Sequence, residues 1–375
     1  MTDNDRGWRR RLRRHQRYGG AWLASIVVLL AAPHDVRACD LCAIYTTTEA
    51  RQETTGPYAG VAEQYTYFAT LKDNGRAVEN TDDQRLRSSI TQVIAGYQVH
   101  PRIGLQLNFP IIARTFRRPT EDGIQNGHET GIGDMSVIAN VKAFSWADTE
   151  RVAHLYLFGG LKFPTGDPSA LSEELNEGQN APPPEPTACS SHVEGCAEPS
   201  ALRVPVRVRP HHAMEAAPTE VASGIHGHDI ALGSGSVDGI VGAQVFGSWK
   251  RAFATAAIQY VARTVGAFGY QYANDLLFET GPGAFLLLGD ALFGEPYSFG
   301  GQILLSGETK GNDSLNGEKA GDTGITALYL GPAFRFSWGT HLGSEIAADL
   351  PLLQNNTQLQ IVPDYRLRGG ISWRF

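Results

Sequence analysis

The sequence ends with Asp364-Tyr365-Arg366-Leu367-Arg368-Gly369-Gly370-Ile371-Ser372-Trp373-Arg374-Phe375. Its apolar residues share one parity, which only Gly369 interrupts: Tyr365, Leu367, Ile371, Trp373 and Phe375. The other parity is polar and mostly basic: Arg366, Arg368, Ser372 and Arg374. A strand points successive side chains to opposite faces. The stretch therefore predicts a strand with one aromatic and aliphatic face and one cationic face.

A strand of this kind at the end of a chain resembles the closing strand of bacterial outer-membrane β-barrels, where a terminal Phe or Trp is the assembly signal. The resemblance implies two partners, the lipid of the outer membrane and the barrel-assembly machinery. In such a barrel, lipid contacts the apolar face and water in the lumen contacts the arginines.

The amino-terminal residues predict export. Six arginines between residues 9 and 17 precede the apolar run 21–32, which is followed by Val36-Arg37-Ala38. This is the pattern of a secretory signal peptide, and the apolar run is too short for a membrane-spanning helix. We expect a cleaved leader at 1–38 and a periplasmic segment at 39–57. Cys39 directly after the cleavage site leaves lipidation open as an alternative.

The composition narrows the class of protein. The chain has 42 glycines, 42% hydrophobic residues and a net charge of -7, which becomes more negative without the basic leader. A nucleic-acid partner is therefore not expected. We find no sustained 3.6-residue periodicity after the leader, which argues against two α/β domains.

Alternation along the chain predicts about twelve strands within a barrel at 58–375. The clearest pair is a hairpin that turns at His100-Pro101-Arg102. The expected strands cover residues 58–69, 87–99, 103–111, 135–144, 152–163, 237–248, 253–263, 276–288, 297–306, 324–337, 341–350 and 365–375. An even number of antiparallel strands is what bacterial barrels contain.

The expected links alternate between short and long. The short ones are 100–102, 146–151, 249–252, 289–296 and 338–340. The long ones are 71–86, 117–134, 164–236, 264–275, 307–323 and 351–364. This alternation predicts short periplasmic turns and long extracellular loops. Trp146, Trp249 and Trp338 lie at short turns, where either an interfacial aromatic girdle or an ordinary core would hold them.

Two short motifs resemble a known family. Gly131-Ile132-Gly133-Asp134 precedes one expected strand, and Lys162-Phe163-Pro164-Thr165-Gly166-Asp167 ends the next. They are similar to the motifs of the outer-membrane transporter family named for the meta-pathway of phenol degradation. The resemblance implies a barrel and the passage of small molecules, and it does not fix a solute. The long insert and the amino-terminal cysteines depart from the family pattern.

The four cysteines form two pairs, Cys39 with Cys42 and Cys189 with Cys196. Cys39-Asp40-Leu41-Cys42 lacks the following His of a haem-attachment motif and the second pair of a four-cysteine zinc site. In an oxidising compartment a small disulfide loop is the default, and a redox or metal-relay role is the alternative. Cys189 and Cys196 could close another small disulfide loop.

The insert 164–236 is Pro-rich, and we expect a largely disordered extracellular loop. No cofactor is required by this fold. Imidazoles nevertheless gather here, and we expect a zinc or copper site formed by His211, His212, His226 and His228. A solvated loop with incidental histidines is the alternative.

The inward parity of the last strands predicts charges that line the lumen: Arg335, Glu345, Asp349, Arg366, Arg368 and Arg374. Unpaired charges in a narrow lumen are costly, so we expect cross-strand ion pairs. These residues either set ion selectivity or fill and stiffen the wall.

The sequence as a whole predicts a non-enzymatic channel or transporter for small solutes in the bacterial outer membrane. No catalytic motif, such as a Gly-x-Ser-x-Gly elbow, His-Glu-x-x-His or a P-loop, occurs in it. The alternative is a structural or partner-binding barrel with metal-linked or redox-linked Cys and His segments.

Overall fold

The computed structural model describes residues 55–177 and 222–375. The expected leader, nearly all of the segment 39–57 and all four cysteines lie outside these residues, as do His211 and His212.

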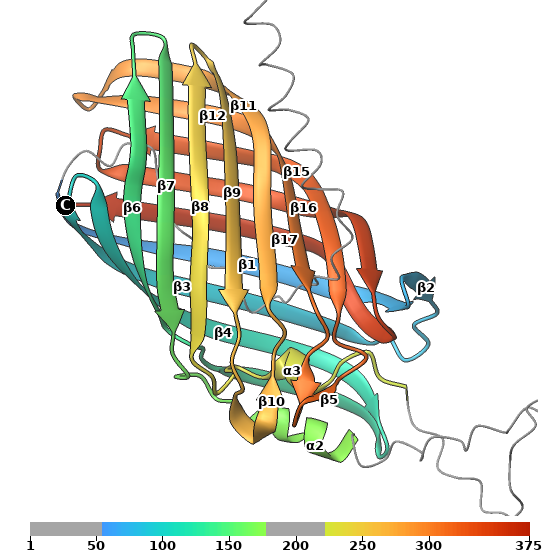
Figure 1. Cartoon of the computed structure of the whole chain (residues 1–375). Helices are drawn as coiled ribbons and strands as arrows, with labels where there is room; N and C mark the ends of the chain where they lie inside the picture. Colours follow the sequence, from blue (N-terminus) through green and yellow to red (C-terminus); the bar gives the residue numbers. More distant parts are fainter. Residues whose placement is uncertain (1–54, 178–221) are drawn as a thin grey trace, which may run out of the picture. The chain divides into compact units, whose positions relative to one another are not determined.

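Twelve antiparallel strands form a closed barrel (Figure 1). They are β1 (Gly56–Asp73), β3 (Arg85–His100), β4 (Ile103–Thr120), β6 (Ser136–Ala147), β7 (Arg151–Lys162), β8 (Asp238–Trp249), β9 (Ala252–Ala262), β11 (Asp275–Leu292), β12 (Glu295–Lys310), β15 (Ile325–Trp338), β16 (Leu342–Asn356) and β17 (Leu359–Arg374). Each strand pairs with the next along this order, and β17 pairs with β1. The prediction of a twelve-strand antiparallel barrel is confirmed.

The barrel strands turn apolar side chains outward, and most polar side chains of the strands point inward. On β4, Ile103, Leu105 and Leu107 are more than two-fifths exposed, whereas Gln106 and Asn108, of the other parity, are buried. Outward apolar side chains are favourable only where lipid replaces water. The described part of the chain is therefore a transmembrane barrel, and its place is the bacterial outer membrane.

The closing strand has the predicted parity. Leu367 and Ile371 lie on the exposed face, and Arg366 is buried on the other. β17 is longer than expected, because it begins at Leu359 and pairs with β1 as far as Asp73. The backbone hydrogen bonds between strands continue beyond the residues that alternate in polarity, so a strand predicted from that alternation is too short.

The alternation of short and long links fails at one place. Residues 351–364 are not a long loop, because only Thr357 and Gln358 separate β16 from β17. Gln358 has a φ of 49°, the left-handed backbone of a tight turn. The expected loop 117–134 also contains a strand, β5 (Gly123–Ile132), which pairs with the end of β4. The other minor elements are β2 (Arg76–Val78), β10 (Tyr270–Gln271), β13 (Ser314–Leu315), β14 (Glu318–Lys319) and a 3-10 turn at Ala267–Gly269.

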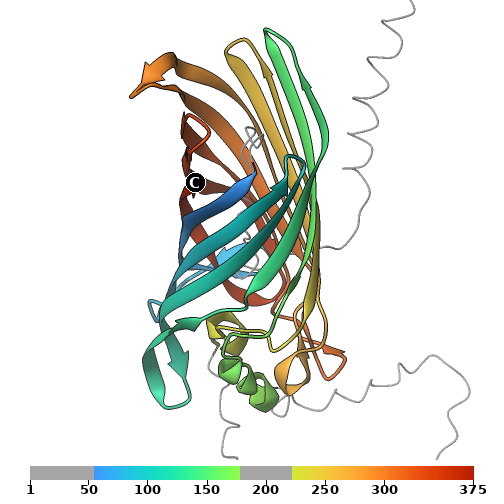
Figure 2. The same cartoon turned by 90° about the vertical axis from the view of Figure 1, so that its left-hand side faces the viewer.

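The two ends of the long insert are folded, whereas its residues 178–221 lie outside the described residues, so the expectation of a largely disordered loop stays a prediction. The two ends contain a 3-10 turn at Ser169–Ser172, α2 (Glu174–Glu177) and α3 (Gly227–Ile230), which lie at the long-loop end of the barrel (Figure 2). Leu171, Ile225 and Ile230 are almost fully buried. Burial of these apolar side chains stabilises the two ends of the insert. The side chains follow no helical or strand period, so the sequence does not predict these elements.

The tryptophans at the short turns are not core residues. Trp146 and Trp249 are 44% and 57% exposed. The ring of Trp338 lies next to that of Trp373, with 5.9 Å between centroids and a tilt of 33°. Aromatic rings at the rim of the outer face are typical of the membrane interface. In the part of the chain that the structure describes, none of the helices has the length and apolarity to cross a membrane.

Candidate functional site

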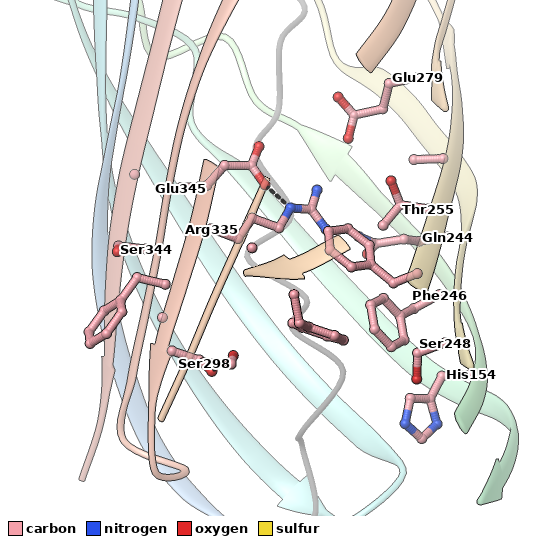
Figure 3. Close-up of a pocket in the computed structure, with 18 of the residues that line it drawn as sticks. His154, Gln244, Phe246, Ser248, Thr255, Glu279, Ser298, Arg335, Ser344 and Glu345 are labelled. Atoms are coloured by element: carbon pink, nitrogen blue, oxygen red, sulfur yellow. Dashed lines mark hydrogen bonds and ion pairs between the residues drawn. The ribbon is translucent and has the colours of Figure 1, made fainter. Parts of the chain in front are cut away.

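The interior of the barrel holds a cavity of about 830 Å³. At one end it reaches the short turns, where Asp148, Glu150 and Lys250 line it. Further in, the wall contains residues from β1, β7, β8, β9, β11, β12, β15, β16 and β17. On β8 the side chains of Gln244, Phe246 and Ser248 point into the barrel (Figure 3). The sequence alone does not decide which face of this strand points inward.

One wall of the cavity is an aromatic row. The ring of His154 lies 6.4 Å from that of Phe246, Phe246 lies 6.1 Å from Phe253, and Phe253 lies 4.9 Å from Phe285. These residues come from the consecutive strands β7, β8, β9 and β11. Sequence reasoning missed the row, although all four rings sit at positions that alternate with outward apolar residues.

The opposite wall carries charges. Arg335 on β15 and Glu345 on β16 are cross-strand partners, and Arg335 Nε lies 2.5 Å from Glu345 Oε2. The close-up shows the pair reaching into the cavity toward the wall that holds Thr255 and Glu279 (Figure 3). Both side chains are about a quarter exposed, so water or a solute in the cavity can reach them.

A second layer of charges lies next to this pair. Arg368 contacts Asp349 at 2.8 Å and Glu279 at 3.0 Å, and Arg366 contacts both carboxylate oxygens of Glu308 at 3.0 Å. Arg366 also lies over the ring of Tyr329, 4.8 Å from its centroid. Five of the six predicted lumen residues thus meet carboxylate or guanidinium partners inside the barrel. The sixth, Arg374, lies 5.6 Å from the ring centroid of Tyr58.

A buried polar cluster at the long-loop end joins the two family-like motifs. Lys162 Nζ lies 2.6 Å from Asp134 Oδ2 and 2.9 Å from Asp238 Oδ2. Asp134 also accepts hydrogen bonds from the backbone N–H of Gly166 and from the backbone and hydroxyl of Ser234. Burial alone would raise the pKa of Asp134, but the contacts with Lys162 and Ser234 outweigh it and lower the pKa below its usual value.

Thr165 and Gly166 complete the contact between the motifs. Thr165 Oγ1 donates to the carbonyl of Gly133 and accepts from the N–H of Met135. Gly166 packs against Gly233 so closely that a Cβ on Gly166 would lie 2.8 Å from the Cα of Gly233. The motifs therefore bind the carboxy-terminal end of the insert to the barrel.

The same cluster continues around the wall as alternating charges. Arg263 on the β9 side contacts Asp238 at 2.8 Å and Asp275 at 2.7 Å. Lys310 contacts Asp313 at 2.8 Å, and Tyr272 lies between the two cations, 5.7 Å from Arg263 and 5.2 Å from Lys310. Each buried charge has an opposite partner, which is the condition for keeping such groups out of water.

Ser234 and Lys162 do not form a nucleophile and a base. The hydroxyl of Ser234 lies 2.7 Å from Lys162 Nζ, but that ammonium group is also within 2.9 Å of two carboxylates. In this contact Lys162 Nζ donates to the Ser234 hydroxyl, and that hydroxyl donates its own proton to Asp134 Oδ2.

The insert ends close the long-loop side of the lumen; we call residues 164–177 and 222–236 the cap. Ile225 and Ile230 pack in one cluster with Phe68, Leu71, Leu86, Phe116 and Ile361 from β1, β3, β4 and β17. Leu171 and Ala231 pack with Tyr270 and Tyr272 on the other side. Arg114 donates to the carbonyls of Asp229 and Ala231, and Arg118 contacts Glu173 at 2.8 Å.

His228 and Glu174 tie the two halves of the cap together. His228 Nδ1 lies 2.9 Å from Glu174 Oε1, which also accepts from the backbone N–H of His228. Burial alone would raise the pKa of Glu174, but the contact with His228 outweighs it and lowers the pKa to about 2. Burial alone would lower the pKa of His228, and the carboxylates of Asp229 and Glu174 instead raise it well above 6.5.

Comparisons with known proteins agree with this architecture. No family model matches the sequence, and neither does any curated protein. An outer-membrane channel from Pseudomonas putida F1 has a similar structure, with a TM-score of 0.52 and 12% identity over 88% of this chain and all of that chain. The β-domain of a Bordetella autotransporter (TM-score 0.37, 9% identity, 86% of this chain and 99% of that one) was also found. The channel from Pseudomonas shares the fold of this chain, an outer-membrane β-barrel.

Proposed function

We propose that this protein is a channel that carries small solutes across the outer membrane. The observation that supports the proposal is the cavity inside the barrel, which reaches the short turns and is lined by side chains rather than filled by them. In this proposal the short turns face the periplasm and the cap faces the exterior. A non-enzymatic role is part of the same proposal.

The dimensions and lining of the cavity favour small amphipathic solutes. Twelve strands about 4.8 Å apart and tilted about 40° give a backbone diameter of ~24 Å, and inward side chains occupy much of it. The aromatic row offers a surface for a ring or an alkyl chain, whereas Arg335 and Glu345 opposite it offer polar contacts. Aromatic acids, fatty acids and sugars form the natural panel for an uptake assay, and we expect the first two to permeate better than sugars.

The charged pair allows a sharp test. Arg335→Gln leaves Glu345 without this partner in the cavity, and Glu345→Gln leaves Arg335 without its partner. In planar bilayers we expect the first variant to shift ion selectivity toward cations and the second toward anions, with the double variant close to the wild type. A matched control is Lys319→Gln, because Lys319 is exposed and lies in β14, outside the barrel wall.

The proposal is contradicted by the absence of conductance and solute uptake for the wild type and for a variant whose cap is destabilised. If conductance exists but all variants have the selectivity of the wild type, the channel stands and the charged pair stiffens the wall instead of setting selectivity. The first outcome would favour the structural or partner-binding barrel, in which Cys39 and Cys42 engage a periplasmic component.

We also propose kinship with the transporter family named for the meta-pathway of phenol degradation. The support is that Asp134 of one motif and Lys162 of the other form one ion pair, 2.6 Å long, and that Thr165 binds Gly133. Asp134 precedes β6 and Lys162 ends the adjacent strand β7, so the two motifs form one structural unit at the end of this strand pair.

A further inference from the structure

A cluster of imidazoles and carboxylates lies where the cap meets the loop between β12 and β15. One ligand atom from each of His226, His228 and Asp229 lies within 4.8 Å of the others. Asp322, in the β12–β15 loop, brings its Oδ2 to 3.1 Å from Nδ1 of His226. The rings of His226 and His228 are 5.5 Å apart between centroids.

The orientation of His228 is fixed by a buried carboxylate. Its Nδ1–H donates to Glu174 Oε1 at 2.9 Å, and its ring stacks on Tyr270 with 6.2 Å between centroids. Nε2 then faces the rest of the cluster, 3.5 Å from Asp229 Oδ1. A carboxylate behind a histidine commonly holds the ring so that its other nitrogen can bind a metal.

We propose that His226, His228, Asp229 and Asp322 bind one zinc ion, with Glu174 as the carboxylate that positions His228. Zinc takes tetrahedral sets of imidazole nitrogen and carboxylate oxygen at about 2.0–2.2 Å, which puts neighbouring ligand atoms ~3.4 Å apart. The ligand atoms of His226, His228 and Asp229 lie within 4.8 Å of one another, and Asp322 lies 3.1 Å from His226, so binding requires these side chains, Asp322 in particular, to move toward a common centre. The set does not require His211 or His212.

The charge of the cluster favours a divalent cation. Three carboxylates, those of Glu174, Asp229 and Asp322, surround two imidazoles. All five side chains are at most 30% exposed, so bulk water screens them only in part. The ion would also join α3 of the cap to the β12–β15 loop, and would therefore hold the long-loop end closed.

The test is calorimetric titration of zinc chloride into the full-length folded barrel after treatment with a chelator. We expect one zinc ion per chain, no measurable binding to a His226→Ala, Asp322→Asn variant, and binding weakened about 10–100-fold by Glu174→Gln. His128→Ala is the matched control, because His128 lies in the exposed hairpin of β5 and should leave binding unchanged. A variant with serine at Cys39, Cys42, Cys189 and Cys196 should also bind normally.

The proposal is independent of the transported solute, because binding is measured directly. If the double variant loses the heat-modifiable gel migration of a folded barrel, Asp322→Asn alone replaces it in the titration. Asp322 lies in a loop and is 23% exposed, so this substitution should not disturb folding. Absence of zinc binding to the wild type would overturn the proposal. So would equal binding by the wild type and the Asp322→Asn variant, or loss of binding when only His211 and His212 are replaced.

Discussion

Lys162 is the residue whose removal should weaken the barrel most. Its ammonium group is the shared partner of Asp134 and Asp238, and its side chain is only 10% exposed. In Lys162→Met, two buried carboxylates lose a common cation, and the free energy of unfolding should fall by about 3–5 kcal/mol. Denaturant unfolding in lipid vesicles, followed by tryptophan fluorescence, measures this loss.

Lys250→Met is the matched control for this substitution. Lys250 is 61% exposed and lies 3.5 Å from Glu150 at a short turn, where water screens the pair. Its replacement should change the free energy of unfolding by less than about 0.5 kcal/mol. Equal effects of the two substitutions would show that the buried cluster does not hold the long-loop end together.

The lowered pKa of Asp134 predicts a dependence of stability on pH. A carboxyl whose folded-state pKa lies below its unfolded value of about 3.9 stabilises the folded state above that pH. The stabilisation is lost as the pH falls through the folded-state pKa. The difference in denaturation midpoint between the wild type and Asp134→Asn should therefore be constant from pH 6 to 8 and shrink below about pH 4. A constant difference down to pH 3 would contradict it.

At the level of single residues, the sequence predicted partners where strand neighbours supply them. Arg335 with Glu345, and Asp349 with the arginines of β17, follow from parity in adjacent strands. Glu308 was missed as the partner of Arg366, because residues 307–323 read as a loop and the two strands are not adjacent. Contacts across a lumen depend on tilt and stagger, which alternation does not encode.

The cap is the element that the sequence concealed. Its helices are single turns of four residues, too short for a hydrophobic period, and its order comes from contacts with strands far away in sequence. Arg114 and Arg118 were the available signal, because both take the inward parity of β4 and need partners that the strand itself does not provide. The twelve strands, by contrast, were predictable because lipid outside and water inside impose the alternation locally.

Packing of the cap can be tested at Ile230, which is 2% exposed. Ile230→Ala should remove about 2–5 kcal/mol of packing free energy from the docked cap. The amides of Ala231 and Leu232, which donate to Gly227 and Asp167, should then exchange hydrogen at least ~30-fold faster. Val265→Ala, at a site 61% exposed, should leave this exchange unchanged. Unchanged exchange in Ile230→Ala would mean that the cap is held by its polar contacts alone.

At the scale of the whole barrel, closure depends on the pairing of β1 with β17. Ala62 and Gly370 are partners in this pairing, and a Cβ on Gly370 would lie 3.6 Å from that of Ala62. This separation suits a disulfide. In a background with serine at the four native cysteines, Ala62→Cys with Gly370→Cys should oxidise readily and should keep the closing strands joined in heated, non-reducing gels.

The matched control is Ala62→Cys with Ser372→Cys, because Ser372 is the partner of Gly60 and therefore lies diagonal to Ala62. Diagonal positions across a strand pair are about 7–8 Å apart, too far for a relaxed disulfide. Efficient oxidation of the diagonal pair, or none of the aligned pair, would indicate a different register at the seam.

The contact of Glu174 with His228 has a practical consequence for protein engineering. Glu174 precedes residues 178–221 and His228 follows them, and the two side chains lie 2.9 Å apart. The folded parts on either side are thus already fastened to each other, and a connection of another length changes the closure entropy only slowly. Residues 178–221 should be exchangeable for a foreign peptide, which, in the proposed orientation with the cap outside, would make the barrel a scaffold for displaying antigens or affinity tags on bacterial cells.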